Sequence, residues 1–375
     1  MHIVDTTLFF APHSGGVKRY LLAKHRYLAS QPDVRHSLLV PGPHDREVAA
    51  GITEQRSLRI PFAGGYRVPL RLRAWRRTLC SLAPDVIEVG DPYHLAWVAL
   101  RAADELGVPA IAFAHSDLAR LLASRFGRGI GRITEAYLRR LYARFDLVMA
   151  PSRSIAERLH GIGLERVVVQ PLGVDGEVFH PSRRDPELRT LLGLPSQTRL
   201  LIFAGRMARE KQIPLLQRAV HELGAPYHLL LVGGERLQHL SDQVTLLPYQ
   251  QDSKRLARLL ASADVLVHAG EHETFGMIFI EAMACGIPVI GMRSGAVAEL
   301  IDEDVGRIAE PGDIASLKRT IVDLFEQDMA AMGAAARQRV EQRYTWESAF
   351  AQQLECYARL HRPRAEQALR LAQVK

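Results

Sequence analysis

The chain has 375 residues, of which 47% are hydrophobic and 24% are charged. This globular composition excludes disordered, collagen-like and coiled-coil proteins, and the length favours two domains. No apolar run is long enough to predict a membrane-spanning helix. The three cysteines are far apart and form no CxxC pair, and residues 1–10 lack a basic signal-peptide region, so we expect a protein of the reducing cytoplasm.

The net charge of +7 belongs to the first half of the chain. Residues 1–180 contain 24 Lys and Arg against 17 Asp and Glu, whereas residues 181–375 contain 24 of each. Such asymmetry indicates an acidic partner, for example a membrane surface, a nucleic acid or a phosphorylated substrate, although a solvated basic surface would give the same composition.

Short apolar runs alternate with longer helical patterns along the whole chain. Continuous apolar runs are typical of strands buried on both faces of a parallel sheet. They predict strands at 3–9, 36–40, 86–89, 110–114, 147–150, 167–170, 200–204, 228–232, 244–247, 265–268, 288–290 and 307–309. The alternation predicts two doubly wound α/β units. A Gly- and Pro-rich break at 171–181 predicts domains at 1–172 and 173–355.

The most informative segment is 269–290, where Glu281 is the one charged residue of an otherwise apolar or small stretch from Gly276 to Met292. A carboxylate in such a helix costs several kcal/mol unless it is paired or hydrogen-bonded. Glu281 is therefore either satisfied by a nearby arginine or accepts hydrogen bonds from two adjacent hydroxyls of a ligand, as a ribose would offer.

A second carboxylate, Glu273, precedes the same helix, and Thr274 is the expected N-cap. If the helix ran through both carboxylates, they would lie ~12 Å apart along its axis. The free N–H groups between them suit an anion, so this layout matches a sugar–diphosphate–ribose ligand. The N–H groups in question belong to Phe275, Gly276, Met277 and Ile278.

Two basic residues, Arg206 and Lys211, follow a buried strand that ends at Gly205. A guanidinium and an ammonium at the carboxyl end of a strand would neutralise a pyrophosphate leaving group, although basic residues after strands are common on protein surfaces.

Two features of the first half lie at strand ends. Gly15 and Gly16 stand between the first strand and a helix that begins near Val17, where they either let the backbone approach a phosphate or sugar or only form a tight turn. His115 directly follows a buried strand, and either faces a ligand or is a satisfied structural histidine.

Several function classes find no support in the sequence. Walker A, H-E-x-x-H and G-x-S-x-G motifs are absent. One D-x-D pattern, Asp302 to Asp304, is of the kind that binds a divalent metal in some glycosyltransferases, but its position before Val305 and Gly306 favours a solvated turn.

Together these motifs resemble those of the retaining family 4 glycosyltransferases of the GT-B fold. The resemblance covers both halves and is most specific in the E-x7-E block that contains Glu273 and Glu281. It also includes the Gly pair 15–16, His115, the 173–181 linker and the Gly-Arg…Lys segment 205–211. Lys18 and Arg19 depart from the acidic or small residue of many relatives, which leaves acceptor recognition open.

The resemblance implies a role for each of these residues. Arg206 and Lys211 would bind the donor diphosphate, Glu281 the ribose, Glu273 the donor-sugar hydroxyls, and His115 the sugar near its reacting carbon. It further implies two Rossmann-like domains, an acceptor-side domain at 1–172 and a nucleotide-sugar-binding domain at 173–355, and a C-terminal helix at about 356–375 that returns to the first domain. It also implies that no metal or other cofactor is needed, and that the sugar is transferred with retention.

We therefore expect an enzyme that moves a sugar from a nucleotide-sugar donor to an acceptor hydroxyl, such as one on a membrane lipid or lipid-linked glycan. The alternatives are a nucleotide-sugar 2-epimerase of the same fold, and a non-catalytic module that binds a nucleotide sugar or anionic lipid. We expect no nucleic-acid partner, because the basic half lacks an aromatic-interleaved binding motif.

An arginine-rich segment suggests a membrane contact. Its apolar residues, Leu72, Trp75, Leu79 and Leu82, recur on one helical face, and residues 117–144 add seven more arginines against two acids. The helix either lies in a bilayer interface or packs on its own sheet with the arginines solvated. The first alternative predicts a peripheral protein at the inner face of the plasma membrane that contacts anionic lipid through Arg67, Arg71, Arg73, Arg76 and Arg77.

Overall fold

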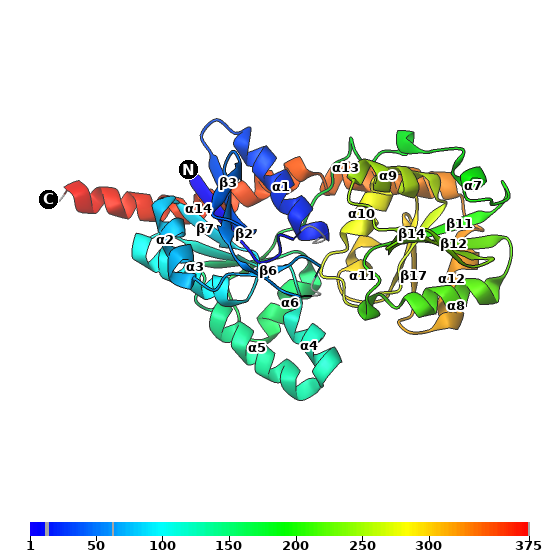
Figure 1. Ribbon diagram of the computed structural model, residues 1–375, viewed down its shortest axis with the longest axis horizontal. Coiled ribbons are helices and arrows are strands. Elements are labelled where there is room, and N and C mark those ends of the chain that lie inside the picture. Colours follow the sequence, from blue (N-terminus) through cyan, green and yellow to red (C-terminus); the bar gives the residue numbers. More distant parts are fainter. Residues whose placement is uncertain (12–14, 62–63, 374–375) are drawn as a thin grey trace. The chain divides into compact units, whose positions relative to one another are not determined.

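The computed structural model describes residues 1–11, 15–61 and 64–373, with the side chains of the last helix described to residue 361. The chain forms two compact units, one of Met1–Pro171 with Trp346–Lys375 and one of Leu172–Thr345. Both are α/β units with a mostly parallel sheet between helices, as the sequence predicted (Figure 1). Residues 12–14, next to the Gly pair, and 374–375, at the end of the predicted C-terminal helix, lie outside the described residues.

In the described part of the first unit, eight strands form a sheet of order β10-β9-β8-β7-β1-β2-β4-β3, parallel except for β3. The strands are β1 His2–Thr6, β2 Arg35–Gly42, β3 Arg46–Ala49, β4 Ile52–Arg56, β7 Val86–Val89, β8 Ala110–Phe113, β9 Leu147–Ala150 and β10 Val167–Val169, with a separate pair β5 Leu58–Arg59 and β6 Arg67–Val68. The helices are α1 Gly15–Ala29, α2 Leu72–Ser81, α3 His94–Leu106, α4 Leu118–Phe126, α5 Arg128–Tyr142, α6 Arg153–Gly161 and α14 Trp346–Gln373.

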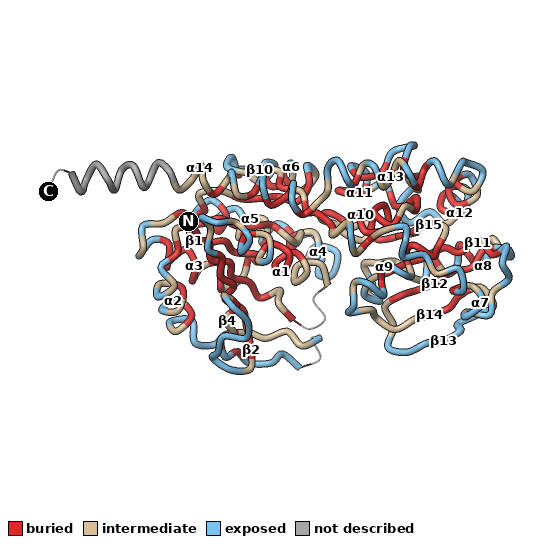
Figure 2. The backbone as a smooth tube through the Cα atoms, turned by 90° about the horizontal axis from the view of Figure 1, so that it is seen from above, coloured by how far each residue is buried: buried red, intermediate tan, exposed pale blue. Residues whose placement is uncertain are grey.

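The two faces of this sheet differ in chemistry. One face, including Val4 and Ile87, packs with helices α2 to α6 into an apolar core that Figure 2 shows as buried. On the other face, Lys24 of α1 pairs with Asp5 of β1 at 2.7 Å and with Glu88 of β7 at 2.9 Å. The apolar run of a strand can thus carry an acid where a helix supplies the cation.

Helix α14 belongs to the first unit through this same cluster of charges. Gln353 donates a hydrogen bond to Glu88 at 3.0 Å, and the Tyr357 hydroxyl donates to the same carboxylate. The helix begins at Trp346 and therefore includes the segment from about residue 356 that the family resemblance implies. At its start, Trp346 stacks on Phe350 at 5.0 Å and both rings lie against the ring of Tyr20.

Helix α2 corrects one expectation. Trp75 and Leu79, the centre of its apolar stripe, are fully buried in the core of the first unit, and the Trp75 indole donates to the Thr6 hydroxyl at 3.1 Å. The stripe therefore packs on the unit's own sheet, and the interpretation of α2 as a helix with its apolar face in a bilayer is wrong. The periodicity of the sequence did not distinguish a helix packed on its own sheet from a helix in a bilayer interface, since both need the same apolar face.

In the described second unit, seven strands form a sheet of order β13-β14-β12-β11-β15-β16-β17, parallel except for β13. Figure 1 shows α8 and α12 on one side of this sheet and α9 on the other. The strands are β11 Arg199–Ala204, β12 Tyr227–Gly234, β13 Gln238–Ser241, β14 Val244–Pro248, β15 Val265–Val267, β16 Val289–Met292 and β17 Gly306–Ala309. The helices are α7 Leu188–Leu191, α8 Ile213–Leu223, α9 Ser253–Ser262, α10 Met277–Ala284, α11 Val297–Leu300, α12 Ile314–Leu324 and α13 Met329–Arg343.

Across the described residues of both units, no helix combines the length and the apolar character needed to cross a membrane.

Candidate active site

The candidate donor site lies in the second unit, at the carboxyl ends of two neighbouring strands. Strands β11 and β15 are parallel, with Leu201 paired to Val265 and Ile202 to Leu266. Because parallel neighbours end at the same edge of a sheet, the segments that follow them, 205–211 and 268–276, start side by side. This adjacency brings together residues that are far apart in the sequence.

The central contact of the site is an ion pair between the Lys211 ammonium and Oε1 of Glu273. Their side chains are 18% and 17% exposed. Burial by itself would raise the pKa of Glu273, but the charges of Lys211 and His268 and the hydrogen bond from Lys211 prevail and hold that pKa at about 2. Glu273 is therefore an ionised acceptor at neutral pH.

His268 supports this carboxylate from the sheet side. It is 1% exposed, its ring is stacked on Phe203 with centroids 5.2 Å apart, and burial lowers its pKa to about 4. Nδ1 accepts the Gly270 N–H at 3.1 Å, so the proton of the neutral ring resides on Nε2, which lies 3.3 Å from Oε1 of Glu273. Both contacts shown for Glu273 among the described residues fall on Oε1, so Oε2 can accept a hydrogen bond from a further donor.

Gly270 is required by a close approach between the two loops. A Cβ atom at this position would lie 2.6 Å from Cε1 of His268 and 3.1 Å from the Glu210 carbonyl oxygen. A larger residue would push the Lys211 segment away from the histidine that supports Glu273. Composition and periodicity gave no sign of His268 and Gly270 as site residues, although both stand in the block 269–290 or next to it.

Arg206 has a different environment from Lys211. Its side chain is 67% exposed and lies 3.3 Å from Oε1 of Glu210, its partner at i+4. Its charge also contributes to the low pKa of Glu273. An exposed guanidinium at the end of β11 can reorient toward a ligand at little cost in packing.

Helix α10 carries two of the N–H groups that the sequence predicts to bind an anion, with one correction to its start. The helix begins at Met277, and the N-cap is Gly276 in a left-handed conformation with φ 90°, not Thr274. A Cβ at residue 276 would lie 2.8 Å from the Phe279 ring, so glycine is needed both for φ and for space. The N–H groups of Met277 and Ile278 stand in the first turn, while Thr274 and Phe275 precede the helix.

Glu281 lies in the second turn of α10 and is 1% exposed. Because the helix does not include Glu273, the spacing of ~12 Å for two carboxylates on one helix does not apply. The structure thus places Arg206, Lys211, Glu273 and the α10 start around one sheet edge, with Glu281 buried in the helix that follows.

His115 belongs to the first unit. It follows β8, stacks on Phe113 with centroids 4.1 Å apart, and meets the Tyr20 ring edge-on at 5.1 Å. Burial and the nearby Lys24 lower its pKa to about 3, so the ring is neutral at physiological pH. Gly15 and Gly16 form the first two positions of α1, two residues earlier than the expected start at Val17.

A cavity of about 410 Å³ lies beside this histidine, between the start of α4, the second half of α5 and the later turns of α6. Its walls include Ala114, Leu138, Ile155 and Leu159, and at one side Asp117 pairs with Arg158 at 3.1 Å. Glu135 and Ser116 also line the cavity, so its walls combine apolar and polar groups, as a site for an amphipathic ligand does.

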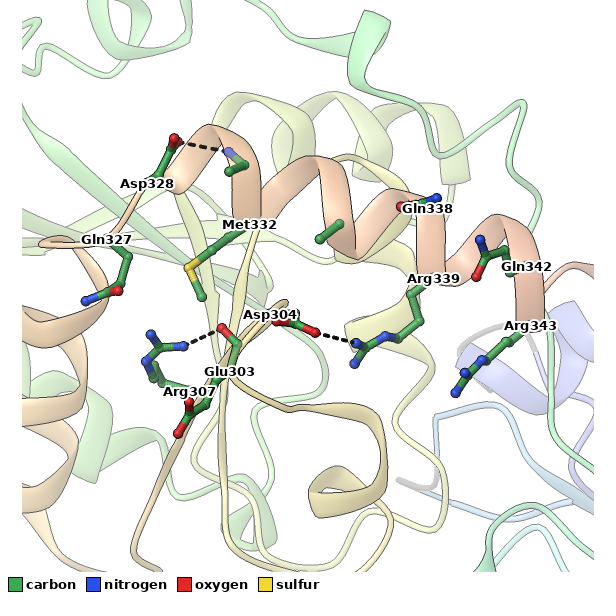
Figure 3. Close-up of a pocket in the computed structure, with 12 residues that line it drawn as sticks. Glu303, Asp304, Arg307, Gln327, Asp328, Met332, Gln338, Arg339, Gln342 and Arg343 are labelled. Atoms are coloured by element: carbon green, nitrogen blue, oxygen red, sulfur yellow. Dashed lines mark hydrogen bonds and ion pairs between the residues drawn. The ribbon is translucent and has the colours of Figure 1, made fainter.

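The D-x-D pattern of the second unit lies before β17, away from the candidate donor site at the ends of β11 and β15. It borders a cavity of about 590 Å³ beside α13 (Figure 3). Arg339 is 2.7 Å from Asp302 and 3.7 Å from Asp304, and Asp302 also accepts the Asp304 N–H. Figure 3 shows Arg307 donating to the Glu303 carbonyl, at 2.6 Å. These contacts fit the solvated turn that the sequence favoured.

Comparison with known proteins agrees with this geometry. Residues 14–178 match the family model "Glycosyltransferase Family 4", and residues 185–340 match "Glycosyl transferases group 1". The chain is similar to a GDP-mannose-dependent alpha-(1-6)-phosphatidylinositol dimannoside mannosyltransferase of Mycobacterium tuberculosis, at 33% identity over 94% of this chain and 95% of the relative. A GDP-mannose-dependent alpha-mannosyltransferase of Corynebacterium glutamicum is 28% identical over 96% and 89%.

Solved structures show the same fold. Sucrose-phosphate synthase from Thermosynechococcus elongatus superposes with a TM-score of 0.80 at 21% identity, over 96% of this chain and 99% of that one. Anabaena HepE, solved with UDP and glucose, superposes with a TM-score of 0.76 at 21% identity, over 96% and 100%. The chain is therefore a glycosyltransferase that belongs to family 4 and has the GT-B fold.

Proposed function

We propose that this glycosyltransferase takes a sugar from a nucleotide-sugar donor and transfers it to a hydroxyl of a lipid acceptor, with retention and without a metal ion. The observation that carries the proposal is the cluster at the ends of β11 and β15. There, two cations, an ionised carboxylate and a helix N-terminus share one sheet edge.

Each part of a nucleotide sugar finds a matching group in this cluster. The diphosphate suits Arg206, Lys211 and the first N–H groups of α10. The sugar hydroxyls suit Oε2 of Glu273, since the contacts of its Oε1 come from Lys211 and His268. The ribose suits Glu281, a carboxylate buried in the same helix.

Cationic side chains in this position support a metal-independent reaction. Negative charge grows on the diphosphate as the bond between it and the sugar carbon breaks, and fixed cations stabilise that charge. For retention on one face, the acceptor oxygen bonds to the same carbon while its proton passes to the departing phosphate oxygen. His115, neutral at physiological pH, would hydrogen-bond the sugar and would not supply the proton.

The relatives narrow the proposal further. Two similar proteins are named as GDP-mannose-dependent mannosyltransferases, and one of these names gives phosphatidylinositol dimannoside as the acceptor. We take GDP-mannose as the first donor to test and a phosphoinositide glycolipid as the first acceptor. The apolar part of the cavity beside His115 supports a ligand with a lipid part.

A lipid acceptor would place the enzyme on the cytoplasmic face of the plasma membrane as a peripheral protein. The exposed arginines Arg71, Arg73 and Arg77 support an electrostatic attraction to anionic lipid, with Arg67 and Arg76 partly exposed beside them. The expected contribution is about 1 kcal/mol for each arginine that nears the surface.

The deciding experiment is a donor screen with UDP-, GDP- and ADP-sugars in the presence of a detergent-dispersed lipid extract. We expect release of GDP that depends on the lipid, survives EDTA, and yields a product with the donor's anomeric configuration by NMR. Glu273→Gln should abolish release. Release that needs no acceptor would instead indicate a 2-epimerase or hydrolase, and rescue of chelated enzyme by Mn²⁺ would refute metal independence.

A further inference from the structure

Helices α4 and α5 form a hairpin whose distal end exposes large apolar side chains. Within the described residues of this end, which we call the hairpin tip (121–133), the exposed fractions are 44% for Leu121, 60% for Phe126, 40% for Ile130 and 68% for Ile133. Figure 1 shows the hairpin projecting from the sheet of its own unit. Neighbouring apolar side chains that stay in water mark an interaction surface.

The hairpin is built to hold this shape. Its base is anchored in the core of the first unit by buried residues that include Leu118, Leu138 and Leu141. Nearer the tip, the two helices approach so closely that a Cβ on Gly131 would lie 2.8 Å from Cβ of Ala123. The exposed apolar residues therefore stand on a packed support, and they are not the consequence of a loosely folded loop.

The charge around the tip identifies the partner. From Leu118 to Thr134 the sequence contains four arginines and no acid. Arg125, Arg128 and Arg132 are exposed, and the Arg125 guanidinium lies 5.5 Å from the centroid of the Phe126 ring. Apolar side chains surrounded by arginines match the border between acyl chains and anionic head groups of a bilayer.

A second copy of the chain fits this surface less well. In a two-fold symmetric dimer the same patch meets itself, so the arginines of one hairpin would face those of the other with no acid between them. An anionic bilayer offers both a negative surface and an apolar interior, and so satisfies the arginines and the apolar side chains together.

We propose that the hairpin tip is the membrane-docking element of this protein, with its apolar side chains inserted at the interface of an anionic lipid bilayer. The hairpin tip would bring the enzyme to the membrane that holds the proposed lipid acceptor, and in this respect the inference rests on the proposed function. Vesicle binding itself requires neither donor nor acceptor, so the two proposals can fail separately.

The test compares Ile133→Asp with Leu191→Asp in sedimentation with phosphatidylglycerol/phosphatidylcholine vesicles. Leu191 is a matched control, because it is also 68% exposed but lies in the second unit. We expect Ile133→Asp to lower the partition coefficient at least ~tenfold, and Leu191→Asp to leave it unchanged. Arg125→Glu with Arg128→Glu should lower it by at least ~fivefold per arginine at low salt.

A second measurement reports insertion directly. The fluorescence that Phe126→Trp adds should be quenched by lipids brominated on the acyl chains, whereas that of Leu191→Trp should not. Equal vesicle binding by Ile133→Asp and wild type, absence of wild-type binding, or no quenching at residue 126 would overturn the proposal. So would a change from dimer to monomer in Ile133→Asp with vesicle binding intact, which would make the hairpin a contact between copies.

Transfer to a detergent-dispersed acceptor separates the two proposals. Ile133→Asp should keep this activity while it loses vesicle binding. Wild-type protein that binds vesicles through the tip but transfers no sugar to any lipid would contradict the proposed function and leave the docking element standing.

Discussion

The Lys211–Glu273 ion pair can be tested as a unit with the variants Lys211→Met, Glu273→Gln and their combination. Removal of Lys211 leaves an ionised, mostly buried carboxylate beside His268. Removal of Glu273 leaves a buried ammonium. Each single change therefore leaves an unpaired charge. The double variant should lose less unfolding free energy than the sum of the losses of the two single variants.

The magnitude follows from the pKa of Glu273. Its decrease from an ordinary 4.5 to about 2 corresponds to about 3 kcal/mol of preference for the ionised form in the folded state. Both side chains are less than a fifth exposed, so solvent screening reduces this little. The charges of His268 and Arg206 also contribute to this shift, and His268 is neutral at pH 7, so the Lys211–Glu273 pair accounts for only part of it. We expect a coupling free energy of about 1–2 kcal/mol at pH 7.

The pH dependence has a defined sign. Because the pKa of Glu273 is lower in the folded state, its contribution to stability is fully present above pH 4.5 and is lost as the pH falls from 4.5 toward 2. The difference in unfolding free energy between wild type and Glu273→Gln should therefore be constant near neutrality and shrink below pH 4.5.

Urea unfolding at pH 7, followed by circular dichroism, measures the cycle. The exposed pair Arg293–Glu310, at 2.7 Å with side chains 61% and 53% exposed, is the control and should show a much smaller coupling. Sugar transfer should be lost in both single variants and not restored in the double, since the two residues are proposed to hold different parts of the donor. A coupling near that of the control, or restored activity in the double variant, would refute this account of the site.

Three further outcomes follow from the same geometry. Arg206→Ala should lower kcat ~100-fold or more with little change in donor affinity or in the free energy of unfolding, because an exposed guanidinium would act on charge that develops in the transition state. A kcat equal to that of wild type in steady-state assays would contradict this. Glu281→Gln should weaken donor binding at least ~tenfold by calorimetry, through the loss of charge-assisted hydrogen bonds to the ribose. His268→Gln should flatten the fall in unfolding free energy that wild type shows as the pH drops from 6.5 to about 4, a window in which the unfolded histidine is protonated and the buried one is not.

The strands were predictable wherever both faces are buried. Every predicted apolar run overlaps a strand of the two sheets, because a parallel strand under two helical layers is mostly apolar. Asp5 and Glu88 are exceptions within such strands, and Lys24 pairs with both. The antiparallel edge strands β3 and β13 were not predicted, and neither were the parallel strand β4 and the short pair β5–β6. Residues Arg46–Ala49 of β3 are all exposed, and β13 is mostly exposed, so neither edge strand carries the apolar signal.

The site was predictable by residue but not by contact. The sequence named Lys211 and Glu273 separately, and their pairing depends on two loops that only the order of strands brings together. The helix start was misplaced because Thr274 satisfies the N-cap preference, whereas the chain needs the left-handed conformation of Gly276 to enter the helix. His268 was missed because it ends a buried apolar strand, and nothing in the sequence distinguishes it there from a histidine that only fills the core.

Each unit contains a buried histidine that is uncharged. His115 has a pKa of about 3 and His268 of about 4, both lowered chiefly by burial, so neither carries charge at physiological pH. A protonated His268 would compete with Lys211 for Glu273 and would add a cation where the sugar is proposed to bind. The neutral ring instead donates a single hydrogen to Oε1, and this fixes the carboxylate without consuming its capacity for a hydroxyl. Cationic charge at this edge thus comes from Arg206 and Lys211, where the diphosphate is proposed to lie, while the neutral His268 fixes the carboxylate that is proposed to hold the sugar.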